Sequence, residues 1–407
     1  MPVVIFVTPY FTDNAAQFIY ALVNLSRPVA VRIISQDIEE NIIGSIRRKV
    51  DRFWKVQDVC DFSQLQAATQ GLIAADEKIL RILAVNEQVQ VPVAELREHL
   101  GVPGMNKKTA QNYRDKELMK TLLEKAGITV AKHELAKTNQ AALQFAKDIG
   151  FPLIAKPPAG AAAQSTYRLK SQVELDQLLA NHPASKKHPW LLEQFLVGKE
   201  HSCDTFMLNG QVMFRTFTRY QPTPLEVVEN PWIQWQVILP LETLSNEFDD
   251  VREVADRVLK TLGPVNGHSH MEWFRLADGS VAVSEIAMRP PGAMFTTLIS
   301  RSADFDAIMA WANLVIYDEF FIPEQKYTVG AAYLRGMGEG RVLRTEGIEF
   351  VDKYYAHLVT DVKIPEPGQE KGKTYEGEGY IVIRSESTQE VEDALKGIVS
   401  NVRVLLL

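Results

Sequence analysis

The stretch HMEWFRLADGSVAVSEIAMRPPG, residues 270–292, predicts two strands joined by a tight turn. Asp278 and Gly279 both tolerate a positive φ, so we expect them to form a two-residue hairpin loop. In that register Glu272 lies directly opposite Glu285, with Cβ atoms about 5 Å apart. The sequence therefore predicts two facing carboxylates on one side of a hairpin.

Two carboxylates at this separation repel each other unless a cation lies between them. Mg²⁺ and Mn²⁺ prefer such hard oxygen ligands, so Glu272 and Glu285 are the predicted metal ligands. Arg289 shares the face of Glu285 and could hold a phosphate group with two hydrogen bonds. A loop one residue longer would turn the two glutamates to opposite faces. A plain hairpin with both glutamates in solvent is the alternative.

The composition indicates a globular chain that is large enough for two or three domains, with 407 residues, 46% hydrophobic and 23% charged. A net charge of −7 argues against a dedicated nucleic-acid surface. Cys60 and Cys203 have no metal-binding spacing, which favours free thiols and a cytoplasmic location. The apolar start is short and follows no basic run, so we expect a buried strand rather than a signal peptide. No apolar run is long enough for a membrane span.

The first hundred residues alternate between strand and helix patterns. Residues 3–7, 29–34 and 79–85 are apolar runs typical of buried parallel strands, and residues 15–25 form a helical pattern. The sequence predicts an N-terminal open α/β domain over residues 1–104. The dinucleotide fingerprint G-x-G-x-x-G is absent from it.

The rest of the chain predicts an α+β domain over residues 105–325, with a lid near 151–220, and a β-rich segment over 326–407. Residues 118–126 carry a helical apolar stripe that Gly127 ends. Residues 218–240 are rich in aromatic residues and proline, and we expect them to be irregular. This segment either lines an acceptor pocket or packs against a sheet.

The segment FPLIAKPPAGAAAQSTYRL, residues 151–169, is an apolar strand that ends in Lys156 and continues into a loop of small residues. Such a loop, with Gly160 and Ser165, lets backbone N–H groups approach phosphate oxygens, and Lys156 adds a positive charge. Lys116 begins the preceding helix. Taken alone, the loop could be a linker and Lys116 a surface lysine.

A second turn follows in WLLEQFLVGKEHSCDTFMLNGQVMFRTFTR, residues 190–219, at Asn209 and Gly210. The register of that turn predicts two cross-strand ion pairs, Asp204 with Arg215 and Glu200 with Arg219. Glu200 follows a strand that stops at a glycine, so its carboxylate could accept hydrogen bonds from two ribose hydroxyls. His268 and His270 are expected to be polar strand residues rather than metal ligands.

Five segments, in this order, resemble the ATP-grasp superfamily: GVPGMNKKTAQNYRDKELMKTLLEKAGI, FPLIAKPPAG, WLLEQFLVGKE, HMEWFRLADGSVAVSEIAMRPPG and YLRGMGEGRVL. The resemblance is greatest to the branch of carboxylate–amine ligases and biotin-carboxylase-like proteins. It implies the ATP-grasp fold, with ATP between two α+β subdomains and two Mg²⁺ or Mn²⁺ ions. The implied reaction activates a small carboxylate as an acyl phosphate, joins it to an amine, and releases ADP and phosphate.

The resemblance also implies residue roles. The catalytic residues would be Arg289, which neutralises the transferred phosphoryl group, and Lys156. The nucleotide would be held by Lys116 and Lys156 at the phosphates, Gly160 and Ser165 in a lid over 157–165, Glu193 with Phe195 and Leu196 at the adenine, and Glu200 at the ribose. Glu272 and Glu285 would carry the metal ions, and Arg335 and Arg219 are candidates for holding substrate. For Arg335 a buried salt bridge is the alternative.

Two departures from the family pattern bear on these roles. Ala287 stands where relatives commonly have an asparagine that binds metal, and the lid has one glycine, Gly160, among alanines, which would stiffen its closure. Two other functions stay open: a carboxylase of the biotin-carboxylase or purine-pathway type, and a non-catalytic nucleotide-binding protein. The expected partners are a small carboxylate and an amine, with no nucleic acid and no membrane, and a homodimer is compatible with the resemblance.

Overall fold

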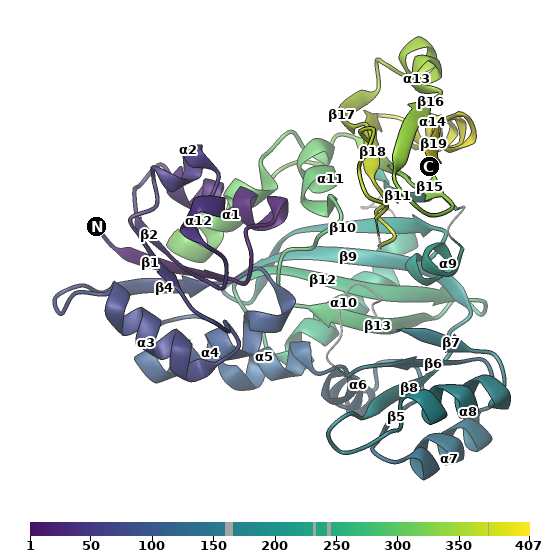
Figure 1. Cartoon of the computed structure of the whole chain (residues 1–407), viewed down its shortest axis with the longest axis horizontal. Helices are drawn as coiled ribbons and strands as arrows, with labels where there is room; N and C mark the ends of the chain where they lie inside the picture. Colours follow the sequence, from purple (N-terminus) through teal and green to yellow (C-terminus); the bar gives the residue numbers. More distant parts are fainter. Residues whose placement is uncertain (159–165, 231–232, 242–245, 373) are drawn as a thin grey trace.

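The computed structural model describes residues 1–158, 166–230, 233–241, 246–372 and 374–407, and Figure 1 shows their arrangement. Four β-sheets make up the described part of the chain. None of its helices is long and apolar enough to cross a bilayer. Cys60 and Cys203 are free thiols, as predicted.

The N-terminal sheet is parallel, in the order β3-β2-β1-β4, because its central strands are apolar on both faces and helices cover them. All six residues of β1 and of β2 are buried. The three predicted strands are confirmed as β1, β2 and β4, and β3 is a further strand. Its elements are β1 Val3–Thr8, α1 Asp13–Val23, β2 Ala30–Ser35, α2 Gly44–Arg47, β3 Arg52–Lys55, α3 Phe62–Leu72, β4 Ile79–Leu83 and α4 Gln90–Leu100.

A small sheet in the order β5-β8-β6-β7 follows, and α7 and α8 pack on its outer face (Figure 1). Its elements are β5 His133–Ala136, α7 Asn139–Ile149, β6 Leu153–Lys156, β7 Tyr167–Leu169, α8 Gln172–Asn181 and β8 Trp190–Gln194. Two helices, α5 Lys107–Arg114 and α6 Lys116–Lys125, connect this sheet to the N-terminal domain.

The large sheet has eight strands in the order β13-β12-β9-β10-β11-β14-β18-β17, and all of its pairings are antiparallel. Its strands are β9 Gly198–Leu208, β10 Gln211–Gln221, β11 Trp235–Leu239, β12 Gly267–Leu276, β13 Val281–Ala287, β14 Thr328–Leu334, β17 Val359–Lys363 and β18 Gly379–Ser385. The helices along this part of the chain are α9 Pro224–Glu229, α10 Asp249–Leu262, α11 Phe295–Ser302 and α12 Ala307–Tyr317. The apolar stripe of α10 packs on one face of β9, β10 and β12. The opposite face packs in part against α11 and α12 and in part borders a cavity.

The C-terminal region contributes three strands to the large sheet, β14, β18 and β17, and has a three-stranded sheet of its own. Its further elements are β15 Gly336–Met337, β16 Val342–Glu346, α13 Ile348–Tyr354, α14 Thr388–Asn401 and β19 Arg403–Leu406. The segment is β-rich, as predicted, and it also contains two helices, of which α14 packs its apolar residues against β14. Gly330 permits that contact, since a Cβ there would lie 2.7 Å from Leu395.

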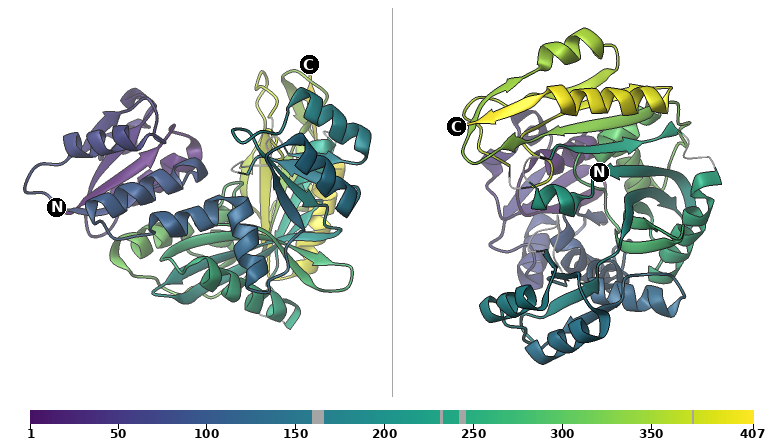
Figure 2. Two further views of the ribbon diagram at one scale, coloured as in Figure 1. Left: turned by 90° about the horizontal axis from the view of Figure 1, so that it is seen from below. Right: turned by 90° about the vertical axis from the view of Figure 1, so that its right-hand side faces the viewer.

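Two further expectations are corrected by the sheets. Residues 218–240 are not irregular, because they contain the end of β10, then α9 and β11. The segment 151–220, predicted as one lid, divides between two sheets, with β6 to β8 in the small one and β9 and β10 in the large one. Figure 2 shows the N-terminal domain at one end of the molecule, and the small sheet on the opposite side of the large sheet from the C-terminal region.

Candidate functional site

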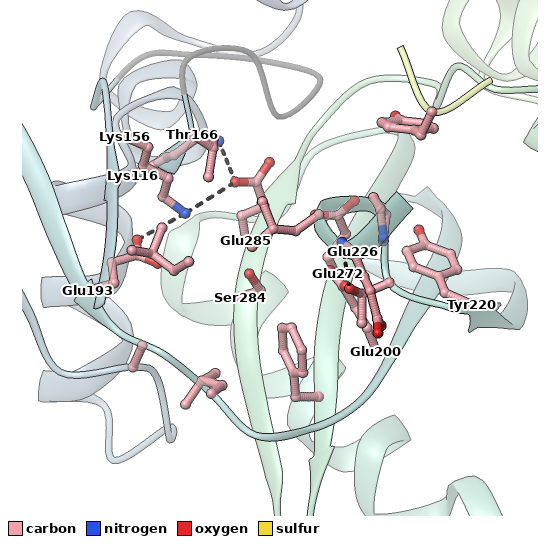
Figure 3. A pocket seen from close by; sticks show the side chains of 18 of the residues that line it. Lys116, Lys156, Thr166, Glu193, Glu200, Tyr220, Glu226, Glu272, Ser284 and Glu285 are labelled. Atoms are coloured by element: carbon pink, nitrogen blue, oxygen red, sulfur yellow. Dashed lines mark hydrogen bonds and ion pairs between the residues drawn. The ribbon is translucent and has the colours of Figure 1, made fainter. Parts of the chain in front are cut away.

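The candidate site is a cavity of about 400 Å³ between the small sheet and one face of the large sheet (Figure 3). The small sheet contributes Lys156 and Glu193, and the large sheet contributes Glu272 and Glu285. In Figure 3 the lysines and Glu193 lie on one side of Glu285, and Glu272, Glu200 and Tyr220 lie on the other. Below, these sides are the lysine end (Lys116, Lys120, Lys156, Glu193) and the carboxylate end (Glu200, His270, Glu272, Tyr220).

The hairpin of β12 and β13 brings Glu272 opposite Glu285, as predicted, but by another route. The loop is one residue longer than expected, because Leu276 N–H donates to Ser280 O at 2.9 Å and Gly279 takes the positive φ of 85°. A β-bulge at Ser284 then shifts the register by one residue, which restores the Glu272–Glu285 pairing. The predicted two-residue loop is wrong, and the predicted carboxylate pair is confirmed.

The hairpin of β9 and β10 differs in the opposite way. Its two-residue turn is confirmed, with positive φ at Asn209 and Gly210. A bulge at Met213 then shifts the register, so the predicted cross-strand ion pairs are wrong. The actual partners are Asp204 with Thr216 and Arg219 with His201.

This shift leaves Arg219 on the face of the sheet that is turned away from the cavity. Its neighbour Tyr220 lines the cavity, and adjacent strand residues point to opposite faces. Arg219 instead pairs with Glu247 at 3.0 Å and with Glu392 at 3.5 Å. The position of Arg219 contradicts its predicted role in holding substrate.

At the lysine end, Lys116 and Lys156 share the carboxylates of the site. Lys116 Nζ lies 2.5 Å from Glu285 Oε2, and Lys156 Nζ lies 3.0 Å from Glu193 Oε1 and 4.0 Å from Glu285 Oε2. Burial would raise the pKa of Glu285, but Lys116 and Lys156 outweigh it and hold that pKa at about 2. Both predicted lysines therefore lie in one cavity, with their charges directed at its centre.

Sequence reasoning missed a third lysine, Lys120, which is one helical turn beyond Lys116 on α6. Its side chain is 1% exposed, and its Nζ lies 3.4 Å from Glu193 Oε1. Burial lowers the pKa of Lys120 to about 8. The i, i+4 spacing from Lys116 was the available indication, since residues so spaced share a helix face.

Glu193 was predicted to meet an adenine, and the structure gives it another partner as well. Its side chain is buried between Lys120 and Lys156. Burial opposes ionisation of Glu193, but the two ammonium groups lower its pKa below the usual value. Phe195 and Leu196, the other residues predicted for adenine, line the same part of the cavity. Arg168 covers the Phe195 ring, with the guanidinium carbon 4.1 Å from the ring centroid.

At the carboxylate end, Glu200 and Glu272 line the cavity together. Burial, followed by the negative charges of Glu272 and Glu285, raises the pKa of Glu200 well above its usual value. The negative charges of Glu272 and Glu285 thus oppose ionisation of Glu200. The side chain predicted for ribose thus lines the cavity.

His270 borders this end and is held from behind by Asp204. His270 Nδ1 lies 2.9 Å from Asp204 Oδ1, and His268 Nε2 lies 3.3 Å from the same oxygen. Burial opposes the charge of His270, but Asp204 outweighs it and raises the pKa of His270 to about 10. Asp204 therefore pairs with the two histidines and not with Arg215. Arg215 pairs with Asp256 at 2.6 Å instead.

The donor set of the cavity fits a divalent ion that is shared with phosphate oxygens. Glu272 and Glu285 offer carboxylate oxygens from adjacent strands, and Ala287 lines the cavity beside them without a donor. In the part of the chain that the structure describes, no three His, Cys, Asp or Glu side chains form a ready-made metal cage. The remaining ligands would have to come from water or from a bound phosphate, as the replacement of asparagine by Ala287 suggested.

Arg289 lies at the cavity and is oriented by the N-terminal domain. Arg289 Nε donates to Glu87 Oε2 at 2.5 Å, and Nη1 donates to Pro290 O at 2.9 Å. Burial opposes its charge, but Glu87 raises the pKa of Arg289 above the usual value. Glu87, which follows β4, was not identified from the sequence because nothing in the local pattern indicates a partner two hundred residues away.

Arg335, predicted to hold substrate, does not line the cavity. The Arg335 guanidinium donates to Val227 O at 2.9 Å and Ile233 O at 2.8 Å, so it anchors the chain around α9. Its predicted role in holding substrate is not supported by this position. Gly160 and Ser165 lie outside the described residues.

The comparisons with known proteins agree with this geometry. Residues 121–305 match the family model of the ATP-grasp domain. An L-arginine-specific L-amino acid ligase of Bacillus subtilis is 24% identical over 313 residues, which are 73% of this chain and 75% of that protein.

Solved structures show the same fold along the whole chain. The L-amino acid ligase from Bacillus licheniformis superimposes with a TM-score of 0.78 at 16% identity and covers 100% of this chain and 99% of its own. The N5-carboxyaminoimidazole ribonucleotide synthetase from Thermotoga maritima has a TM-score of 0.71 at 16% identity and covers 100% of both chains. At these identities the likeness concerns the fold alone.

Proposed function

Because residues 121–305 form an ATP-grasp domain, we propose that this chain is an ATP-dependent carboxylate–amine ligase. It activates a small carboxylate as an acyl phosphate, joins it to an amine, and releases ADP and phosphate. The observation that carries the proposal is the convergence of Lys116, Lys156, Glu272, Glu285 and Arg289 on one cavity.

The nucleotide lies with its phosphates at the lysine end. Lys116 and Lys156 bind phosphate oxygens, and Phe195 and Leu196 border the adenine. Glu272 and Glu285 would hold a divalent metal ion, which would supply positive charge against the phosphate oxygens. Catalysis of phosphoryl transfer is mostly positioning and charge neutralisation, which suits this set of residues.

The acyl chemistry takes place between Arg289 and the carboxylate end. A carboxylate is a poor electrophile because its oxygen is a bad leaving group, and phosphorylation converts that oxygen into a good one. The guanidinium of Arg289 neutralises the phosphoryl group in transfer and then the acyl phosphate. The amine attacks the acyl carbon, the C–O bond to phosphate breaks, and an amide forms.

We propose amino acids as the substrates, since the named relatives include L-amino acid ligases. Beyond His270 the cavity ends in aromatic side chains, namely Tyr220, Trp235, Phe295 and Tyr375. These rings come from four segments of the chain, and the Trp235 and Tyr375 centroids are 4.6 Å apart. They would border the substrate side chains and exclude water from the acyl phosphate.

The decisive experiment incubates the protein with ATP, Mg²⁺ and amino acids in pairs, and measures ADP release together with product masses. We expect ADP release that depends on both amino acids, and a product mass equal to their sum less one water. The Glu285→Gln variant is the negative control.

Two outcomes would overturn the proposal. ADP release that requires bicarbonate instead of a second amino acid would indicate the carboxylase. ATP binding without turnover in any pair would indicate the non-catalytic protein. The cytoplasmic location and the homodimer stay predictions, and size-exclusion chromatography with light scattering would test the second.

A further inference from the structure

The direction in which Glu285 points depends on one β-bulge. On the turn side of the bulge, Trp273 faces Val283, and that register would continue with Glu272 facing Ser284. Glu285 would then lie on the other face of the sheet, among the apolar residues that pack on α10. The extra residue at Ser284 turns Glu285 into the cavity instead.

The bulge lies on the outermost strand of the large sheet, so a full neighbouring strand does not hold it. Beyond β12, the described contacts of β13 include one isolated bridge, between Val130 and Val283. An extra residue on an edge strand leaves a backbone carbonyl to be satisfied by other groups. The carbonyl of Ser284 is the one concerned here.

Lys120 satisfies that carbonyl. Its Nζ donates to Ser284 O at 2.6 Å, and the same ammonium group lies 3.4 Å from Glu193 Oε1. On the other side of Glu285, Ile286 N–H donates to the sulfur of Met119 at 3.4 Å. Consecutive residues of α6 thus hold the backbone on both sides of Glu285.

We propose that Lys120 is a positioning residue, whose ammonium group fixes the Ser284 bulge and thereby keeps the Glu285 carboxylate turned into the cavity. The importance of this contact for catalysis rests on the proposed ligase function. The contact itself, between Lys120 Nζ and Ser284 O, does not depend on that function. Lys116 and Lys156 contact carboxylate side chains in the cavity, whereas Lys120 binds the backbone of the strand that carries Glu285. Loss of the Lys120 ammonium group would leave the Ser284 carbonyl and the buried Glu193 carboxylate without this partner, which is costly.

Backbone hydrogen exchange of the protein without nucleotide tests the structural part. In Lys120→Met, amides of residues 282–287 should exchange at least about tenfold faster than in the wild type. The control is Lys125→Met, which removes an exposed lysine from the same helix and should leave that segment unchanged. If Lys120→Met does not fold, Lys120→Gln keeps one donor to Ser284 O and should show a smaller increase. Wild-type exchange in residues 282–287 of a folded Lys120 variant would overturn the proposal.

A double-mutant cycle between Lys120→Met and Glu285→Gln tests the functional part. ATP affinity is measured with and without Mg²⁺, so the readout does not require ligase turnover. If Lys120 acts through Glu285, each single variant loses the Mg²⁺-dependent gain in ATP affinity, and the double variant loses no more. If Lys120 only attracts phosphate, its loss weakens ATP binding equally with and without Mg²⁺ and adds to the loss from Glu285→Gln, which would overturn the proposal. Failure of every pair of amino acids to turn over would concern the proposed function and leave both of these tests intact.

Discussion

Two hairpins of the large sheet meet side by side, β9–β10 and β12–β13, and each contains one tight turn and one bulge. In β9–β10 the turn is the one its Asn-Gly pair predicts, and the bulge at Met213 alters every pairing beyond it. In β12–β13 the turn is longer than its Asp-Gly pair predicts, and the bulge at Ser284 restores the pairing that matters. The register at the functional residues is therefore the combined result of turn and bulge.

The difference has a chemical consequence. The β12–β13 hairpin presents two carboxylates to the cavity, whereas the corresponding ion pairs predicted for β9–β10 do not exist. Asp204 on β9 instead supports His270 on β12. Under the proposed function, the β12–β13 hairpin would provide the metal ligands, and the β9–β10 hairpin supports it through the contact of Asp204 with His270.

The largest effect is expected from a substitution in the β12–β13 hairpin. Glu285→Gln should lower the turnover number by a factor on the order of 10³ or more, because an amide neither balances the two lysines nor binds a divalent ion as a carboxylate does. Steady-state ADP release at saturating Mg²⁺ measures it. Glu247→Gln, at an exposed partner of Arg219, is the matched control and should keep wild-type turnover. Near-normal turnover in Glu285→Gln would contradict the assignment of this hairpin.

The next effect concerns the supporting hairpin. Asp204→Asn should destabilise the fold by about 3 kcal/mol, because it leaves two buried histidines without their carboxylate. Urea unfolding measures the loss. Arg215→Met should cost less, since its partner Asp256 is 59% exposed, and its effect should add to that of Asp204→Asn. Non-additive effects of the two substitutions would support the predicted pair of Asp204 with Arg215, which the bulge at Met213 excludes.

The pH dependence of stability, measured in EDTA, separates the two ends of the cavity. The pKa of His270 is raised to about 10, so its contribution is full below its unfolded pKa of 6.5 and is lost as pH rises through 10. The pKa of Lys120 is lowered to about 8, so the folded state binds fewer protons between 8 and 10.5 and gains stability there. Of these two groups, only His270 changes the stability between pH 6.5 and 8, and it lowers the stability as the pH rises. His270→Gln should therefore flatten the fall in melting temperature over that interval, and an unchanged slope would contradict the His270–Asp204 pair.

A smaller effect compares the two turns directly. Gly210→Ala and Gly279→Ala should each destabilise the protein by about 1 kcal/mol, because both glycines have a positive φ. A methyl group added at either glycine would have no heavy atom within 4 Å beyond its chain neighbours, so the cost is conformational in both. Thermal unfolding should give similar shifts for the two variants. Unequal shifts would show that one of the loops does not adopt the described turn.

The last substitution, Arg219→Ala, is expected to leave the kinetics unchanged. Arg219→Ala should leave turnover and the KM for each substrate within about twofold of the wild type, because Arg219 lies on the face away from the cavity and pairs with Glu247, an exposed residue. Steady-state kinetics with both substrates varied measure it. A large rise in the KM of one substrate would restore the prediction that the register overturned.

The sequence predicted what depends on local chemistry. Buried strands such as β1 follow from continuous apolar runs, and the order of motifs identified the ATP-grasp superfamily and its fold, which the family match and the structural neighbours confirm. Lys116, Lys156, Glu272, Glu285 and Arg289 all reach the cavity as expected.

What the sequence missed depends on contacts between distant segments. The bulge at Ser284 is held by Lys120, and 164 positions separate the two residues. No local pattern marks the bulge, and the i, i+4 spacing of Lys120 from Lys116 indicates a shared helix face but not a contact with Ser284. The same holds for Arg219, whose face was fixed by a bulge rather than by its turn.

The contact between Glu87 and Arg289 joins the N-terminal sheet to the catalytic cavity. Glu87 also lies 3.8 Å from Arg114, so one carboxylate in the 3₁₀ helix Glu87–Val89, after β4, contacts two other parts of the chain. The N-terminal domain therefore contributes directly to the site, because its Glu87 orients Arg289. A chimera that replaces residues 1–104 with another parallel sheet would retain the lysines and the glutamate pair. It would orient Arg289 only if the segment after its last strand also carried a carboxylate at the position of Glu87.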